Sequence, residues 1–191
     1  FQRLITYWRH LWNNDSLPFY FVQLAAYLKP VAVQPDSEWA ALRQAQADAL
    51  NLNNTAMVVT TDIGDSTDIH PKNKQEVARR LSLVALHRSY GFDEITDKAP
   101  ELSRCEIKCN EATLTFDDDV ITKGESPCGF IVLNDKGEWI IPVAVKTDAR
   151  TIKLSADSDI VAVKYNWADY PCGNLSGSTG LPVALFAAGK Y

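Results

Sequence analysis

The first 90 residues carry patterns for three helices that alternate with two short buried strands, and this order constrains the fold more than any other feature. Apolar residues recur at helical spacing over 1–12, 38–50 and 72–89, and aromatic and β-branched runs predict strands at 18–24 and 57–62. A helix between two consecutive strands requires parallel pairing with a right-handed crossover. Two strands are too few for a stable sheet of this kind. We therefore expect partner strands from elsewhere.

The pattern changes after about residue 95. Short apolar or alternating runs follow one another at 112–116, 129–133, 139–145, 151–154 and 160–165, with turn residues between them. Short strands separated by frequent turns are typical of an antiparallel β-sandwich. The sequence therefore predicts an α/β protein in which 1–95 contribute to a parallel sheet with helices. Residues 96–191 are predicted to form an accessory β-sandwich domain.

Composition excludes several partners. The net charge is −5, and no cluster of Lys and Arg with interleaved aromatic residues offers a basic face for nucleic acid. No apolar stretch approaches the roughly 20 residues of a membrane span. The run Asp117–Asp119 lacks the glycine and glutamate of an EF-hand loop, so we predict neither a metal nor a cofactor. The cysteines at 105, 109, 128 and 172 fit either disulfides in an exported protein or free thiols.

An acidic loop with a histidine follows the second predicted strand. A histidine flanked by carboxylates at the carboxyl end of a strand is where an open α/β sheet places its chemistry. The neutral imidazole of His70 could take a proton from a hydroxyl, with Asp68 or Asp65 holding its tautomer. One alternative is that His70 merely caps the next helix. For the acids, the alternatives are a solvated loop and a role of Asp68 as the cap of that helix.

Other polar residues are weaker candidates. Gly64-Asp65-Ser66 spells a lipase-like nucleophile motif, but Ser66 lies only four residues before His70, so we interpret it as a coincidence. The spacing of Asp62, Asp65 and Asp68 does not place two carboxyl groups on opposite sides of a sugar ring. On the second predicted helix, the inner face is marked by Trp39, Leu42 and Ala49. The polar residues Glu38, Arg43 and Gln46 then point either to solvent or to a substrate.

Several segments resemble the sialate O-acetylesterases, which belong to the SGNH hydrolase superfamily. They are Pro18–Leu24, ending in Val-Gln-Leu; Ser37–Gln46, with the pattern Trp-x-x-Leu-Arg-x-Ala-Gln; the histidine block Thr61–Val77; and Val163–Pro171 with Gly180–Pro182. The resemblance implies a flavodoxin-like α/β/α hydrolase domain followed by an accessory β-domain. It also implies a periplasmic or extracellular location, or a lysosomal one in a eukaryote.

The family resemblance implies that a serine attacks an acetyl ester on a sugar, with His70 as base. Superfamily members usually place aspartate three residues before the histidine, where this chain has Thr67, so Asp68 is the nearest substitute and a serine–histidine dyad is the other arrangement. The nucleophile block belongs to an N-terminal half that this sequence lacks. We therefore expect a C-terminal portion that is inactive alone and needs that half, on the same chain or on a second one.

Two alternatives to the esterase remain open from the sequence. One is a non-catalytic glycan-binding module, in which Trp139 or Trp167 stacks on a sugar ring. The other is an accessory segment of a glycoside hydrolase. Against the first, both tryptophans could simply fill the core of the β-domain.

Overall fold

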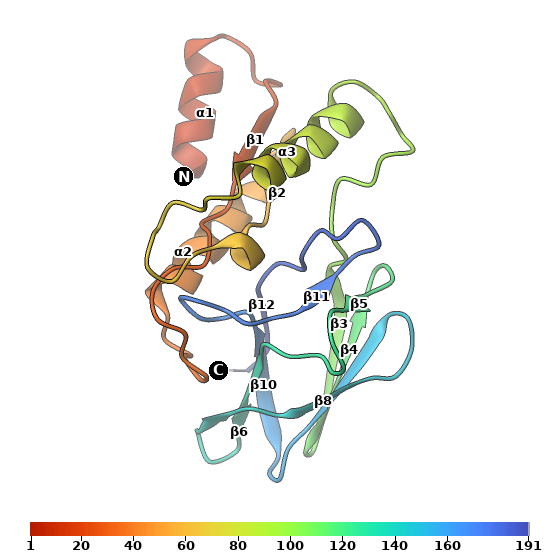
Figure 1. Ribbon diagram of the computed structural model, residues 1–191. Coiled ribbons are helices and arrows are strands. Elements are labelled where there is room, and N and C mark those ends of the chain that lie inside the picture. The colour runs from red at the N-terminus through yellow and green to blue at the C-terminus, as the bar shows by residue number, and fades with distance from the viewer. Residues whose placement is uncertain (191) are drawn as a thin grey trace.

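Strands β1 (Phe19–Val22) and β2 (Thr55–Val58) form a parallel pair, with Phe19 opposite Thr55 and Val22 opposite Val58. The computed structural model describes residues 1–190 and places this pair among the helices in the upper part of Figure 1. The helices are α1 (Gln2–Leu11), α2 (Glu38–Ala47) and α3 (Lys74–Arg88), with 3₁₀ turns η1 (Asp48–Asn51) and η2 (Thr61–Ile63). The predicted parallel pairing is confirmed.

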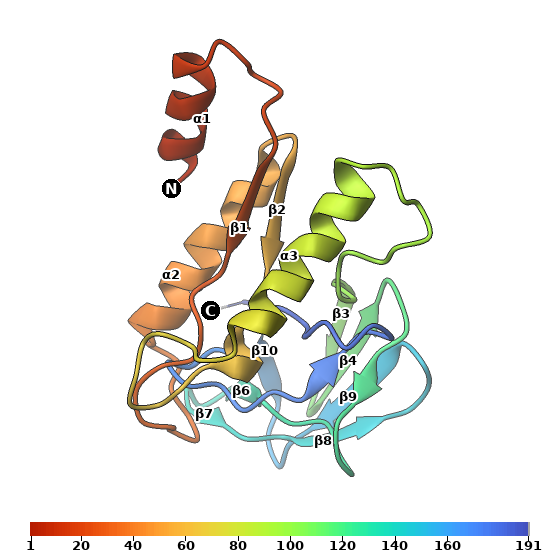
Figure 2. The same cartoon turned by 45° about the horizontal axis from the view of Figure 1, so that its top comes forward.

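Helical elements cover both faces of the β1–β2 pair (Figure 2). On one face the strands pack against α1 and η1, in a cluster of Ile5, Phe19, Phe21, Ala49, Leu52 and Met57. On the other face they pack against α3, in a cluster of Tyr20, Ala56, Val58, Leu81 and Val84. Successive side chains of a strand point to opposite faces, so two short apolar strands supply both clusters. Among residues 1–190, no helix has the length and apolarity to cross a membrane.

The inner face predicted for α2 is partly wrong. Ala49 is buried and Trp39 is half-buried, but Leu42 is exposed. Ala40 and Arg43 are buried instead, and they share one face of the helix because they are three residues apart. Ser37 caps the helix, because its side chain accepts a hydrogen bond from the backbone N–H of Ala40 at 2.9 Å.

The C-terminal part contains two four-stranded antiparallel sheets that share one core (Figure 1). Strand order is β3-β4-β9-β8 in the first and β12-β10-β6-β7 in the second, and β5 pairs with β11 alongside. The strands are β3 (Leu102–Lys108), β4 (Glu111–Phe116), β5 (Ile121–Thr122), β6 (Phe130–Asn134), β7 (Trp139–Ile140), β8 (Val143–Lys146), β9 (Thr151–Ser155), β10 (Ile160–Tyr165), β11 (Leu175–Ser176) and β12 (Phe186–Gly189). The core takes Leu114 and Ile152 from one sheet and Val132 and Val163 from the other.

The single strand predicted over 139–145 is wrong. The chain leaves β7 after Ile140 and enters β8 at Val143, and these two strands belong to different sheets. Pro142 lies between them and has no N–H to donate to a ladder, which explains the break. The strand predicted over 57–62 ends at Val58, because Thr61–Ile63 turn into η2.

A candidate active-site loop after strand β2

The loop that carries His70 leaves the carboxyl end of β2 and lies against the segment that follows β1. The backbone N–H of Gln23 donates to the carbonyl of Val58 at 2.9 Å, and the Thr60 hydroxyl donates to the carbonyl of Gln23 at 2.8 Å. A Cβ atom at Gly64 would lie only 2.2 Å from the carbonyl oxygen of Ala26. The two segments therefore touch along their main chains, which fixes where this loop begins.

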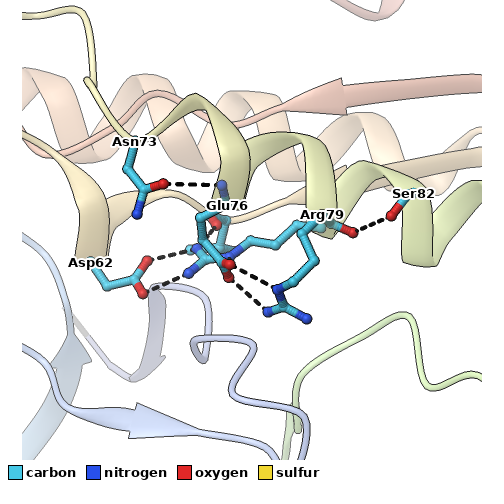
Figure 3. A network of polar contacts seen from close by, with 7 residues as sticks. Asp62, Asn73, Glu76, Arg79 and Ser82 are labelled. Carbon is cyan, nitrogen blue, oxygen red and sulfur yellow. Dashed lines mark hydrogen bonds and ion pairs between the residues drawn. The ribbon is translucent and has the colours of Figure 1, made fainter.

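Arg80 anchors the start of the loop to α3. Its Nη1 and Nη2 atoms each donate to one carboxylate oxygen of Asp62 at 2.7 Å, and Nη1 also donates to the carbonyl of Val59 at 2.6 Å. The Arg80 side chain is only 2% exposed, so this pair is shielded from water on the arginine side. Figure 3 shows Asp62 facing the side chains of α3 from the start of the loop. Paired donors of this kind fix both distance and orientation.

Glu76 completes the cluster from the first turn of α3. It accepts two hydrogen bonds of 2.7 Å from Arg79 and one of 2.8 Å from Arg80 (Figure 3). These hydrogen bonds, those of Arg79 foremost, lower the pKa of Glu76 to about 2. The carboxylate therefore stays charged at neutral pH and holds Arg80 in the orientation that reaches Asp62.

His70 lies beside Asp68, as predicted. Nδ1 of the ring is 3.1 Å from Oδ1 of Asp68, and the same oxygen accepts the backbone N–H of His70 at 2.9 Å. A carboxylate only accepts, so the contact selects the tautomer with its proton on Nδ1 and leaves Nε2 as an acceptor. The backbone N–H of His70, followed by its ring, lowers the pKa of Asp68. The His70 side chain is 82% exposed, so the ring is open to approach.

Asp68 does not cap helix α3. The cap is Asn73, whose side-chain oxygen accepts the backbone N–H of Glu76 at 3.1 Å (Figure 3). The alternative in which His70 or Asp68 caps α3 is therefore wrong. The solvated-loop alternative is not contradicted, because the side chains of His70 and Asp68 are 82% and 43% exposed.

Asp65 makes no direct contact with His70 in the described part of the chain. Its carboxylate accepts the backbone N–H and the hydroxyl of Thr67, at 2.9 and 2.8 Å, and lies 3.6 Å from the Lys72 ammonium. The bonds from Thr67 lower the pKa of Asp65. Ser66 likewise forms no hydrogen bond with His70 within residues 1–190. The structure therefore brings His70 together with Asp68 but not with Asp65 or Ser66.

Arg43 is neither solvent-facing nor aimed at a substrate, because it is fully buried where α2 meets the C-terminal part. It donates to four carbonyls: Leu24 at 2.9 Å, Ala25 at 2.9 Å, Ala168 at 2.7 Å and Asp169 at 2.7 Å. Burial lowers its pKa to about 10, and the nearby Asp169 carboxylate opposes that effect. The guanidinium therefore ties the segment after β1 to the segment after β10.

Neighbouring side chains reinforce this junction. The Asp169 carboxylate accepts the Ser37 hydroxyl at 2.6 Å and the Gln34 amide at 2.5 Å. Gln46, which was predicted to face solvent or a substrate, accepts the backbone N–H of Leu24 at 2.9 Å. Arg43 stands three residues after Ala40 and shares its face of the helix, but no pattern in the sequence marked that face as buried.

The two tryptophans proposed for sugar stacking flank a lysine. The ammonium of Lys164 lies 4.7 Å from the ring centre of Trp139 and 4.6 Å from that of Trp167, which is the geometry of a cation–π contact. The same ammonium donates to the carbonyl of Pro35 at 2.9 Å. Both rings are half-buried, and each has one face occupied by Lys164. They therefore neither fill the shared core nor offer two free faces to a sugar.

Comparison with known proteins gives consistent matches. No protein-family model matches the chain. The sialate O-acetylesterase of Mus musculus is 28% identical over 195 residues, which cover 90% of this chain and 36% of that protein. The Homo sapiens sialate O-acetylesterase is 26% identical over 198 residues, which cover 90% and 37%. The crystal structure of a carbohydrate acetylesterase from Xanthomonas citri aligns with a TM-score of 0.90 at 32% identity.

The Xanthomonas citri alignment covers 100% of this chain and 45% of that chain. The mixed α/β fold with several antiparallel sheets is therefore that of part of a carbohydrate acetylesterase. The chain spans little more than a third of the curated relatives that it matches. The resemblance expected from the sequence is confirmed.

Proposed function

This chain is a relative of the sialate O-acetylesterases, and from that premise we propose that it carries the general base of a carbohydrate O-acetylesterase. The observation that carries the proposal is the pairing of His70 with Asp68 on an exposed loop after β2. The loop lies at the carboxyl end of a parallel strand, which is the edge where open α/β sheets bind their ligands. Sialic acid or another acetylated sugar is the proposed substrate.

The proposed reaction is acyl transfer to water. His70 accepts the proton of a serine hydroxyl at Nε2 while the serine oxygen attacks the acetyl carbonyl. The imidazolium then gives this proton to the departing sugar oxygen, and the acetyl group stays on the serine. In the second half, His70 accepts a proton from a water molecule, which attacks the acetyl carbonyl. The proton then goes to the serine oxygen, and acetate leaves. Asp68 holds the ring through Nδ1 and stabilises its positive charge during each step.

We propose that the serine comes from the portion of the enzyme that this chain does not match. Ser66 makes no hydrogen bond with His70 within the described residues, and the chain has no Gly-x-Ser-x-Gly motif. Helix α1 also presents large apolar side chains to solvent, namely Leu4, Tyr7, Trp8, Leu11 and Trp12. An apolar face of this size favours a covering partner. The N-terminal half of the same esterase, linked or separate, is the partner we propose.

The finer architecture follows from the same proposal. Residues 1–95 would supply the C-terminal half of a flavodoxin-like SGNH domain, because two parallel strands between helical layers need further strands beside them. Residues 96–191 would form the accessory β-sandwich. A periplasmic or extracellular location, or a lysosomal one in a eukaryote, follows from the family resemblance alone.

The test measures acetate release from acetylated sugars by the complete enzyme. General-base assistance contributes roughly 10²–10⁴-fold, so His70→Ala should lower kcat by at least that range. His87→Ala is the control for the loss of an imidazole elsewhere, because the His87 ring lies on α3 and contacts the carbonyl of Ile95. Residues 1–191 alone should release no acetate. An unchanged kcat for His70→Ala would contradict the proposal, and sugar binding without acetate release would favour the glycan-binding module.

A further inference from the structure

Two cysteines from distant parts of the sequence line the same cavity. The cavity has a volume of about 220 Å³ and is lined by residues that include Cys128, Trp167, Pro171 and Cys172. Cys128 lies just before β6, and Cys172 lies in the segment between β10 and β11. Both are exposed at the surface, and the thiol of Cys128 donates to the carbonyl of Cys172 at 3.0 Å.

The main chains beside these cysteines run in contact. A Cβ atom added to Gly129 would lie 2.5 Å from the Cα of Gly173, so no side chain fits between the two segments. Disulfides join residues whose Cα atoms are usually 4.4–6.8 Å apart. Gly129 and Gly173 directly follow the two cysteines, so Cys128 and Cys172 lie on neighbouring stretches of main chain, as a disulfide between them requires. This observation is independent of the thiol hydrogen bond.

Two asparagine side chains hold the two segments in this position without any covalent link. Asn174 accepts the backbone N–H of Cys128 at 2.9 Å and donates to the carbonyls of Lys123 and Ser126 at 2.8 and 2.9 Å. Asn166 is buried and accepts the backbone N–H of Gly173 at 2.8 Å. The backbone N–H of Asn166 donates to the carbonyl of Gly129 at 2.9 Å. These hydrogen bonds therefore hold the two segments next to one another before any covalent bond forms.

We propose that Cys128 and Cys172 form a disulfide when the protein meets a disulfide oxidant such as oxidised glutathione. In the first step one cysteine thiolate attacks a sulfur of oxidised glutathione and releases one reduced glutathione. The other cysteine then displaces the second glutathione. Two S–H bonds are lost, one S–S bond forms in the protein, and the two electrons reduce the glutathione disulfide to two thiols, which keep the protons.

The Cys128 thiol is harder to ionise than an ordinary cysteine. Partial burial of its sulfur atom, and then the neighbouring Cys172, raise the pKa of the Cys128 thiol, although the residue reaches the surface. Thiolate is the attacking species, so exchange should accelerate as the pH rises above neutrality. The other two cysteines lie in different surroundings. Cys105 packs against the core of the C-terminal part, and Cys109 lies in the turn between β3 and β4.

The disulfide would hold in place the segment after β10, which accepts the hydrogen bonds of Arg43. The carbonyls of Ala168 and Asp169 accept hydrogen bonds from Arg43, and these residues lie four and three residues before Cys172. Cys128 and Cys172 are 44 residues apart in sequence, so the bond would close a long loop in the unfolded chain. Loop closure of this length predicts a rise in Tm of roughly 5–10 °C over the reduced protein.

The experiment equilibrates the full chain with reduced and oxidised glutathione, blocks remaining thiols with an alkylating agent, and maps tryptic peptides by mass spectrometry. We expect a linked peptide that contains Cys128 and Cys172, and its loss on treatment with a reductant. Cys128→Ser and Cys172→Ser should each abolish it, whereas Cys109→Ser should retain it. Alkylation of both residues in the oxidised wild-type protein, or linkage of either to Cys105 or Cys109, would overturn the proposal. The assay involves no esterase activity, so its outcome is independent of the proposed function.

Discussion

The two carboxylate oxygens of Asp62 each accept one hydrogen bond from Arg80 at 2.7 Å, which joins the start of the His70 loop to α3. Arg80→Ala would remove both hydrogen bonds to this carboxylate and the one to the carbonyl of Val59. Water reaches the Asp62 side chain, which is 21% exposed, so we expect a loss of roughly 1–3 kcal/mol in the free energy of unfolding, less than the cost of breaking a fully buried pair. Urea denaturation measures it. Arg79→Ala is the matched control, because Arg79 is more exposed and contacts only Glu76, and it should cost less than about 1 kcal/mol. Equal losses in the two variants would refute the anchoring role.

The low pKa of Glu76 makes stability depend on pH. The carboxyl group has an ordinary pKa of 4.5 and a folded-state pKa of about 2. Between these values the unfolded chain binds the proton and the folded chain does not, so the free energy of unfolding falls as the pH falls. The contribution is complete above pH 4.5. Glu76→Gln should therefore show a shallower decline in stability than the wild type across this window. Parallel curves from urea denaturation at several acidic pH values would contradict this expectation.

Asp68 and Asp65 should differ in their effect on catalysis. Asp68→Asn keeps an acceptor for the backbone N–H of His70 but removes the negative charge beside Nδ1. We expect kcat of the complete enzyme to fall by at least about tenfold, since orientation and charge both support the general base. Asp65→Asn should cause a smaller loss, because the Asp65 carboxylate bonds to Thr67. Initial-rate measurements on both variants give the comparison, and the reverse order would exclude Asp68 as the positioning residue.

Arg43→Lys should loosen the junction between the two parts of the chain. A lysine ammonium lacks the planar fork that reaches four carbonyls at once, and each buried carbonyl left unpaired carries a desolvation cost. We expect the free energy of unfolding to fall by roughly 2–4 kcal/mol. Limited proteolysis should also cut more readily within 24–37. The control is Arg104→Lys on β3, where the guanidinium lies at the surface beside Glu106. Equal losses of unfolding free energy in the two variants would contradict the role of Arg43 at the junction.

Local patterns in the sequence were sufficient for the helices and for the parallel pair, and they narrowed the acid beside His70 to Asp68 or Asp65, of which the structure shows Asp68. Each of these depends on residues close together in the chain, where spacing fixes the geometry. Strand β3 was missed because half of its residues are polar and its alternation is weak. Strands β5 and β11 have two residues each, which is too short for any periodic pattern.

The roles of Arg43 and Arg80 could not be predicted in the same way. Arg80 reaches across 18 residues to Asp62, and Arg43 reaches across 125 to Ala168. Their partners are set by tertiary packing, and a buried arginine in a helix has the same local signature as an exposed one.

The junction at Arg43 depends on carbonyl oxygens, which every amino acid possesses. Side chains at Leu24, Ala25 and Ala168 can therefore be exchanged through evolution for others of similar size while the guanidinium keeps all its acceptors. A joint built in this manner tolerates sequence drift in the two segments it connects. It is sensitive mainly to the arginine itself, which makes that position the one to monitor when chimeric enzymes are assembled from diverged esterases.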